Sequence, residues 1–351
     1  WAAPSIGPGG VFNHTNPTNP FADWNLVFIH KCSYDRFMGR RTAHAEPLLE
    51  DHHPIGYMPG SQNQVGTLVP LGTQIRIAYR GHDIVDAVID TLADTTVSYN
   101  DIWGEWTMPS LANANTVMFI GHSGGSRGAT MIIDDVAAHL RDAAPGVDVR
   151  FVTDGGFDPA AKSVVTGATY PSINYPTNDP ANGGDPFAVA SDLQDGFETH
   201  WNADGDATCV DNEIDPGLCG DNLHVLMNWV ETPMFIRQDL ADAKHMTAKD
   251  VNGATIHDCW QVNWDPDPYA CYGDTFQHGG AVLAQVADLA LLRTQALSHT
   301  VLGTVMPRPS GFFPACGHHD GAHTNNGFDD TLTTAGGITT SYANALLNWY
   351  R

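Results

Sequence analysis

Basic residues are scarce in this sequence. Lysine and arginine together number 16 against 40 aspartate and glutamate residues, which gives a formal net charge of −24. Because nucleic acids and anionic membranes are bound through basic patches, this balance argues against both classes of partner. Long apolar runs are also missing, since none reaches the roughly 18 residues that a membrane-spanning helix needs. No C-x-x-C motif occurs, so the cysteines do not favour a zinc site.

The six cysteines indicate an oxidising compartment, and we expect a secreted, extracellular or periplasmic protein. Their spacing favours three disulfides, although other connectivities stay open. The favoured pairs are Cys209 with Cys219, Cys259 with Cys271, and Cys32 with Cys316. No signal peptide is evident and the first residue is a tryptophan, so we expect the sequence to begin after processing or inside a longer precursor.

Residues 115–140 carry the most informative motif in the chain. Thr116 to Ile120 is a continuous apolar run that favours a buried strand, and it leads directly into Gly121-His-Ser-Gly-Gly125, a G-x-S-x-G motif. Apolar residues then recur at 129, 132, 133, 136, 137 and 140, on one face of a helix. A serine between a buried strand and a helix is typical of a nucleophile elbow, so we expect Ser123 to be catalytic. The alternative is a glycine-rich turn in which the serine has no chemical role.

Strands and helices alternate along much of the chain. The sequence predicts short strands at 25–30, 147–153 and 232–238, and helices at 81–92, 281–297 and 342–350. This alternation implies an α/β fold with a mostly parallel sheet and helices on both faces. Residues 40–74 show no clear period and are predicted to form a surface loop, and Pro/Gly/Asp-rich insertions are expected at about 170–222 and 245–275. One α/β domain spanning residues 1–351 is the economical interpretation.

A serine hydroxyl needs two partners to act as a nucleophile at neutral pH. A neutral imidazole accepts its proton, and a carboxylate orients that imidazole. In α/β-hydrolases the acid and then the histidine follow the serine in the chain, on loops at the carboxyl ends of later strands. The candidates by position are Asp154, Asp239 and Asp242 for the acid and His318, His319 and His323 for the base. Asp154 follows the strand next to the elbow, which is early for the acid.

Five sequence blocks resemble the pectin acetylesterase/Notum family of serine esterases. Residues 25–39 resemble an apolar strand followed by C-S-x-D and an aromatic-to-glycine step, and Gly121–Gly125 stands where the family has G-x-S-A-G-G. Asp154-Gly-Gly-Phe157 resembles the family's D-S/A-G-aromatic turn. The blocks that resemble Q/N-x-x-x-D and F-x-P-A-C-x-x-H, which carry the family's acid and base, are Gln238-Asp-Leu-Ala-Asp242 and Phe313-Pro-Ala-Cys-Gly-His-His319.

The resemblance implies an α/β-hydrolase-like fold and a Ser-His-Asp triad. Ser123 would attack the ester, His319 would transfer the proton and Asp242 would orient His319. The implied substrate is an acylated carbohydrate such as pectin, or a small ester, hydrolysed through an acyl-enzyme without a cofactor for catalysis. Two alternatives stay open. One is a general carboxylesterase or polyester hydrolase with the same triad, and the other is an inactive family member that acts as an extracellular binding or assembly protein.

The oxyanion hole is predicted only in part. The motif nominates the backbone N–H of Gly124, the residue after the serine, as one donor. In the family, a Gly-Gly-Gly-Trp-Cys loop upstream of the first matching strand helps to form the hole, and this sequence begins too late to contain it. Gly9-Gly10 is not a convincing substitute. Either the loop belonged to a part of the precursor that was removed, or it sits on another piece, or the second oxyanion donor differs. Loss of one oxyanion donor raises the barrier by about 3 kcal/mol, which supports the inactive alternative.

An acidic stretch at 202–213 has the ligand spacing of an EF-hand calcium loop. The residues at the ligand positions are Asn202, Asp204, Asp206, Thr208 and Glu213. Against this interpretation, the central position is Ala207 rather than glycine, Cys209 falls inside the loop, and no flanking helix pair is evident. The sequence therefore leaves two interpretations, a structural calcium ion and a solvated acidic loop. Zinc bound in the histidine-rich stretch 318–323 is an alternative to the catalytic role of that stretch.

Overall fold

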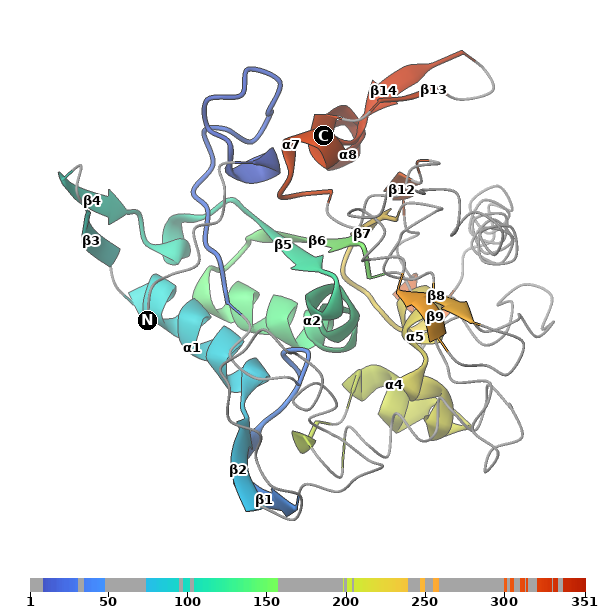
Figure 1. The fold of residues 1–351 in the computed structure, drawn as a ribbon. Helices are drawn as coiled ribbons and strands as arrows, with labels where there is room; N and C mark the ends of the chain where they lie inside the picture. Colours follow the sequence, from blue (N-terminus) through green and yellow to red (C-terminus); the bar gives the residue numbers. More distant parts are fainter. Residues whose placement is uncertain are drawn as a thin grey trace.

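The protein is described by a computed structural model of the chain, drawn in Figure 1. The described residues are 9–30, 35–47, 74–94, 97–101, 104–156, 198, 201–203, 205–238, 247–249, 255–258, 300–301, 304–305, 310–312, 314, 321–329, 331–333 and 337–351. Within these ranges, a parallel sheet lies between two layers of helices.

Four strands form the central sheet. They are β5 (Thr116–His122), β6 (Asp148–Asp154), β7 (Met234–Arg237) and β12 (Ser310–Phe312). Their order is β12-β7-β6-β5, and every neighbouring pair is parallel. The strands predicted at 147–153 and 232–238 are therefore confirmed, together with the parallel α/β architecture. Because the strands run in one direction, the segments that follow them all leave from the same edge of the sheet.

Helices cover both faces of this sheet, as Figure 1 shows. On one face lie α1 (Gly81–Asp94), α2 (Gly124–Ala143) and α5 (Asn222–Asn228), and on the other lie α7 (Asn325–Asp329) and α8 (Tyr342–Tyr350). The alternation of side chains along a strand explains how both layers are held. In β5, Val117 and Phe119 pack into the core beneath α1 and α2, whereas Met118 and Ile120 pack into the core beneath α8.

The amphipathic helices at 81–92, 129–140 and 342–350 occur where the sequence predicted them. In α1, Val85 and Ile89 lie one turn apart and are both buried, and Val136 is fully buried in α2. The start of α2 is earlier than predicted, directly after Ser123. Ser341 begins α8 as a cap, because its side chain accepts a hydrogen bond from a backbone N–H of the first turn.

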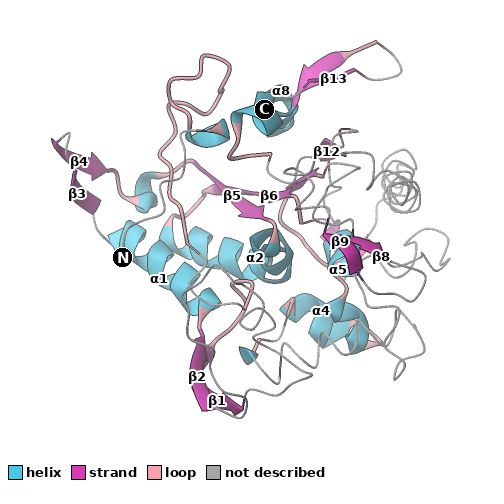
Figure 2. Ribbon diagram, viewed as in Figure 1, coloured by secondary structure: helices cyan, strands magenta, loops and turns pink. Residues whose placement is uncertain are grey.

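The remaining elements are hairpins and short helical turns, which Figure 2 separates by colour. The antiparallel pairs are β1 (Arg41–Pro47) with β2 (Gln74–Tyr79), β3 (Val97–Asp101) with β4 (Gly104–Met108), β8 (Thr247–Lys249) with β9 (Thr255–Asp258), β10 (Thr300–Val301) with β11 (Thr304–Val305), and β13 (Thr331–Thr333) with β14 (Thr339–Ser341). The helical turns are η1 (Gly10–Phe12), η2 (Leu111–Asn113), α4 (Ala207–Asn212) and η4 (Pro216–Gly220).

Two secondary-structure predictions are wrong. Residues 25–30 form no strand, and Val27 and Phe28 are 45% and 52% exposed. An apolar run becomes a strand only where a neighbouring strand supplies hydrogen bonds. None of the described strands pairs with residues 25–30. Part of the predicted loop at 40–74 is instead β1, because β2 supplies its partner. The helix predicted at 281–297 lies outside the described residues.

The described parts of the two insertions contain ordered elements. The first holds α4 and η4, which the disulfide Cys209–Cys219 joins as the spacing predicted, with its Cα atoms 5.8 Å apart. The second holds the β8–β9 hairpin. The other four cysteines lie outside the described residues, and the single domain 1–351 stays a prediction. None of the described helices is long and apolar enough to cross a membrane.

Candidate active site

Ser123 occupies the sharp turn between β5 and α2. Its backbone has φ 54° and ψ −124°, a conformation that residues other than glycine rarely adopt. The N–H of Ser123 donates to the carbonyl of Asp154 at 2.8 Å, and its carbonyl accepts from the N–H groups of Ser126 at 2.9 Å and Arg127 at 3.2 Å. These bonds hold the strained turn between the sheet and the helix. Ser123 is half-buried, and it has the strand-turn-helix context that a nucleophile elbow requires.

Glycines surround the serine because the chain comes too close for side chains. A Cβ atom on Gly121 would lie 2.7 Å from Ser126 Cα, and one on Gly156 would lie 2.5 Å from Ser123 O. Both distances are below the 3.0 Å that real Cβ atoms essentially always keep. The first glycine therefore lets the helix approach the strand, and the second lets the turn after β6 approach the serine.

Gly124 lies at the position expected of an oxyanion donor. It is the first residue of α2, and backbone N–H groups in the first turn of a helix have no partner inside that helix. Among the described residues, none accepts a hydrogen bond from the Gly124 N–H. The helix dipole also places partial positive charge at this end of α2. The N–H is therefore available to a negative oxygen formed at Ser123, and its role stays a prediction.

A loop that the sequence analysis did not assign to the site packs against the elbow. Asp35 is fully buried and anchors this loop, because its carboxylate accepts from the N–H of Gly81 at 2.7 Å and from the N–H of Phe37 at 3.1 Å. The ring of Phe37 would lie 3.3 Å from a Cβ atom on Gly125, directly after the serine turn. Asp35 is the aspartate of the C-S-x-D block, so the sequence did contain a signal for this loop. Its role as a buried anchor becomes visible only in the fold.

At the same edge of the sheet, His122, Asp154 and Arg237 form a lateral row across β5, β6 and β7. They are register partners, His122 with Asp154 and Asp154 with Arg237. His122 Nδ1 lies 3.1 Å from Asp154 Oδ2, and Arg237 Nη1 lies 3.5 Å from Asp154 Oδ1. Asp154 Oδ2 also accepts from the N–H groups of Gly321 at 3.2 Å and Ala322 at 2.9 Å. Asp154 and Arg237 are both fully buried.

Opposite effects set the pKa of Asp154. Burial alone would raise it, but the hydrogen bond from His122 and the positive charge of Arg237 hold the pKa of this carboxyl below its usual value. Asp154 is therefore ionised at neutral pH. Burial, and then the negative charge of Asp154, raise the pKa of the Tyr342 hydroxyl well above its usual value. This tyrosine is therefore neutral at neutral pH.

His323, one of the base candidates by position, joins the end of this row. Its ring is 4.4 Å from the ring of His122, centre to centre, in an edge-to-face arrangement. Ligand atoms of His122, Asp154 and His323 lie within 4.8 Å of one another, a donor set that suits zinc. However, the carboxylate already accepts two backbone hydrogen bonds and faces Arg237, so a metal dication would lie beside a guanidinium. We interpret the group as a hydrogen-bonded cluster.

The two predicted partners of Ser123 lie outside the described residues. Asp242 follows β7 in the chain. The last described residue before it is Gln238, which is buried and donates its N–H to the carbonyl of Phe312 at 3.2 Å. His319 lies between β12 and the described segment that begins at Gly321. The strands that precede them in the chain, β7 and β12, end at the edge of the sheet where Ser123 lies, and the roles of Asp242 and His319 stay predictions.

Residues 2–351 match the sequence model of the pectinacetylesterase family. The chain belongs to the pectinacetylesterase family. As a member of this family it is a carboxylic ester hydrolase. Comparison with curated protein sequences gives no match.

Two solved structures share the fold of this pectinacetylesterase family member, and both are crystal forms of the Wnt deacylase Notum from Drosophila. The first has a TM-score of 0.57 and 18% sequence identity, and covers 97% of this chain and 72% of the Notum chain. The second has a TM-score of 0.53 and 17% identity with the same coverage. At this identity the likeness concerns the fold alone, and it confirms the α/β-hydrolase-like architecture.

Part of the stretch predicted to bind calcium is helical in this family member. Asp206 is the N-cap of α4, where its side chain accepts from the N–H of Cys209 at 2.8 Å. The carbonyl of Thr208 lies inside that helix, and Glu213 Oε2 lies 2.7 Å from His224 Nε2. Of the other predicted ligands, Asn202 is described with φ 52° and Asp204 lies outside the described residues. A short capped helix therefore occupies residues 207–212 of the stretch 202–213, and calcium binding stays a prediction.

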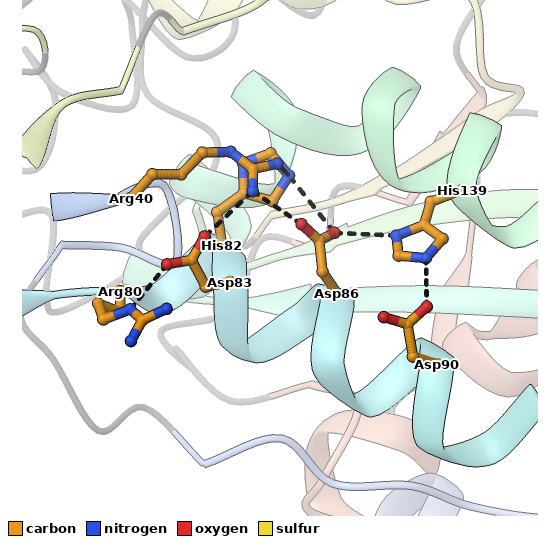
Figure 3. A network of polar contacts seen from close by, with 7 residues as sticks. All are labelled: Arg40, Arg80, His82, Asp83, Asp86, Asp90 and His139. Atoms are coloured by element: carbon orange, nitrogen blue, oxygen red, sulfur yellow. Dashed lines mark hydrogen bonds and ion pairs between the residues drawn. The ribbon is translucent and has the colours of Figure 1, made fainter. Parts of the chain in front are cut away.

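A second group of charged side chains joins α1 to α2, as Figure 3 shows. Arg40 Nη1 lies 3.2 Å from Asp83 Oδ1 and 2.8 Å from Asp86 Oδ2. His139, in the second half of α2, contacts Asp86 Oδ1 at 3.1 Å and Asp90 Oδ1 at 2.7 Å. We call these residues, together with Arg80 and His82, the helix-pair network. It tethers two neighbouring helices and is not part of the candidate site.

Proposed function

We propose that this chain is a secreted serine esterase that hydrolyses O-acetyl or other O-acyl esters of a polysaccharide. Ser123 is the nucleophile, His319 is the general base, and Asp242 orients His319. The observation that carries the proposal is the backbone of Ser123, held at φ 54° between β5 and α2. Such strain persists only where the surrounding structure enforces it, and it clusters at functional sites. Membership of the pectinacetylesterase family supports the ester chemistry.

The proposed reaction has two steps. His319 removes the proton of the Ser123 hydroxyl as its oxygen attacks the ester carbonyl, and the Gly124 N–H donates to the oxyanion. The tetrahedral intermediate collapses, the sugar oxygen takes the proton from His319, and an acyl-enzyme remains. A water molecule then attacks the acyl group, again with His319 as base. His319 then returns the proton that it took from the water to the serine oxygen as the bond to the acyl group breaks, so the carboxylic acid leaves and free Ser123 is restored.

Secretion is part of the same proposal. The disulfide Cys209–Cys219 supports it, because such bonds persist mainly in oxidising compartments. The acylated carbohydrate as substrate rests on the family, since none of the described contacts identifies an acyl group or a sugar.

Labelling with a fluorophosphonate probe tests the nucleophile. The wild-type chain should take up one probe at Ser123, located by peptide mass spectrometry, and Ser123→Ala should take up none. Ser126→Ala is the matched control, because Ser126 lies next to the same turn but is fully buried, and it should be labelled as fast as the wild type. His319→Gln and Asp242→Asn should each slow labelling by about 100-fold or more.

Substrate assays separate the alternatives. Release of acetate from acetylated xylan or acetylated pectin supports a polysaccharide esterase, whereas activity confined to p-nitrophenyl esters or polyesters indicates a general carboxylesterase. A chain that takes up no probe and hydrolyses none of these substrates is the inactive family member. Hydrolysis that survives Ser123→Ala at the wild-type rate would contradict the proposed nucleophile.

A further inference from the structure

The row His122, Asp154 and Arg237 lies directly beside the strained serine. The three residues are register partners at the last positions of β5, β6 and β7, and Ser123 follows His122 in the chain. Side chains alternate along a strand, so residues in register on parallel neighbours point to the same face. That face is the one that packs beneath α8, since Val152 and Phe235, two positions before Asp154 and Arg237, belong to its core.

Asp154 contacts the serine turn and the described segment that begins at Gly321. Its backbone carbonyl accepts the N–H of Ser123 at 2.8 Å, which fixes the elbow. Its carboxylate accepts the N–H groups of Gly321 and Ala322, in the segment that follows the proposed base in the chain. Gly321 packs closely against Asp154 and Arg237. A Cβ atom on Gly321 would lie 2.6 Å from Asp154 Oδ1 and 2.4 Å from Arg237 Nε, so no larger residue fits there without a shift. Through its backbone carbonyl and its carboxylate together, Asp154 therefore ties two distant segments at one edge of the sheet.

The ionised state of Asp154 makes these ties strong. Hydrogen bonds from backbone N–H groups to a carboxylate are shorter and stronger than those to a neutral acceptor. Arg237 balances the charge from the side of β7, and His122 donates from the side of β5. A cation, an imidazole and two backbone amides thus face the carboxylate and favour its charged form. His323 and the neutral Tyr342 also lie near it.

We propose that Asp154 is a positioning residue for the ester hydrolysis proposed above, and that His122 is its partner on the elbow. The carboxylate sets the distance between Ser123 and the segment that carries His319, without touching the substrate. The inference rests on the proposed function. If the ion pair were purely structural, its loss would lower the stability of the fold and leave turnover of the folded enzyme unchanged. The two roles therefore give different measurements.

Variants of His122 test the inference with little risk to folding, because its side chain is 31% exposed. His122→Ala removes the donor to Asp154 and should lower kcat about tenfold on p-nitrophenyl acetate, with KM within about twofold. His122→Asn places an amide nitrogen where Nδ1 lies and should restore most of kcat. His139→Ala is the matched control, a histidine that also bonds two carboxylates but lies in the helix-pair network, and it should keep the wild-type kcat.

Asp154→Asn is the direct test. It should lower kcat and the rate of fluorophosphonate labelling about 100-fold in folded protein, because small displacements of reacting groups slow catalysis by about that factor. Hydrogen exchange of the Gly321 and Ala322 amides should also become faster, and this readout does not depend on activity. If Asp154→Asn does not fold, two measurements decide whether Asp154 positions the site. They are the kcat values of His122→Ala and His122→Asn, and the exchange of the Gly321 and Ala322 amides in His122→Ala.

The results separate the two proposals. Loss of labelling in Ser123→Ala together with wild-type kcat in folded Asp154→Asn and His122→Ala would overturn the positioning role and leave the esterase intact. Equal activity of wild type and Ser123→Ala would overturn the esterase. Unchanged exchange of the Gly321 and Ala322 amides in Asp154→Asn would overturn the tie to the base segment, whatever the activity.

Discussion

Among the described residues, two groups of histidine, aspartate and arginine side chains have different surroundings. In the row at the sheet edge, the side chains of Asp154 and Arg237 are 0% exposed. In the helix-pair network of Figure 3, the side chains of Arg40, Asp83 and Asp86 are 40%, 25% and 23% exposed. Water screens the second group and not the first, so the same charges interact far more strongly at the sheet edge.

The difference in burial predicts which of the two groups affects turnover. A buried charge needs its partners in fixed positions, which makes the sheet edge rigid beside Ser123. The helix-pair network can lose a partner to water without leaving a buried charge. We therefore expect substitutions in the row to affect both stability and turnover, and substitutions in the network to affect stability slightly and turnover not at all.

Arg237→Met should cause the largest loss of stability. It leaves the Asp154 carboxylate buried without its cation, which typically costs about 3–5 kcal/mol. Arg40→Met is the matched substitution in the network and should cost about 1 kcal/mol or less. Urea denaturation at pH 7 measures both.

A double variant sharpens this result. Asp154→Asn combined with Arg237→Met leaves neither charge buried and should be more stable than Arg237→Met alone. If Arg237→Met and Arg40→Met cost the same, burial does not distinguish the two groups and the comparison fails.

Asp206 shows how the pKa of a buried carboxylate changes where none of the described side chains places a cation beside it. Asp206 is 3% exposed, and burial, together with the negative charges of Asp134 and Asp135, raises its pKa to about 7 although it caps α4. Asp206→Asn keeps a good N-cap and removes the charge, so it should stabilise the protein at pH 8 by about 2 kcal/mol. Urea denaturation in EDTA measures this without any bound calcium.

The sign of the pH dependence follows from the raised pKa. Between the unfolded pKa of 3.8 and the folded pKa of about 7, the folded state binds more protons than the unfolded state. Stability therefore falls as pH rises through this window, and the advantage of Asp206→Asn should appear there and be absent at pH 3.5. An advantage that is equal at both pH values would show that charge is not its cause. If calcium raises the midpoint of the wild type and not of Asp206→Asn, the predicted calcium site is supported.

Local patterns predicted the parts of this fold that depend on short-range sequence. Apolar spacing predicted α1, α2, α8 and the strands β5, β6 and β7, and the elbow followed from glycines around one serine. The row could not be predicted, because it depends on strand register. His122, Asp154 and Arg237 lie far apart in the chain, and only the register of β5, β6 and β7 brings them together.

The same limit explains the errors. Residues 25–30 are apolar enough for a strand, yet strand formation depends on a partner that the sequence does not name. The calcium loop is a separate case that stays a prediction. The oxygen spacing from Asn202 to Glu213 fits it, but Asp206 is also a good helix cap, and residues 207–212 form a helix. Asp242 and His319 came from resemblance to a family, since the sequence pattern alone left several acids and histidines open.

Ser123→Gly should stabilise the protein by about 1 kcal/mol while abolishing activity. A non-glycine residue at φ 54° carries about 1–3 kcal/mol of strain, which glycine relieves. Part of this stabilisation is lost because glycine gives the unfolded chain more conformational freedom. Ser126→Gly is the matched control, because it places glycine inside α2 and should destabilise by about 1 kcal/mol. Thermal denaturation of both variants decides whether strain is stored at the elbow. Destabilisation by Ser123→Gly would contradict it.

His139→Gln should have the smallest effect. Burial lowers the pKa of His139, but hydrogen bonds to Asp86 and Asp90 outweigh burial and raise it above 6.5. Its charged form therefore stabilises the fold fully below pH 6.5, and this contribution is lost as pH rises through the folded pKa. Because the pair is solvent-accessible, we expect His139→Gln to cost less than about 1 kcal/mol at pH 5.5, nothing at pH 9, and less still in 1 M salt. A loss at pH 5.5 as large as that of Arg237→Met would mean that the network behaves as a buried group, which would break the contrast with the sheet edge.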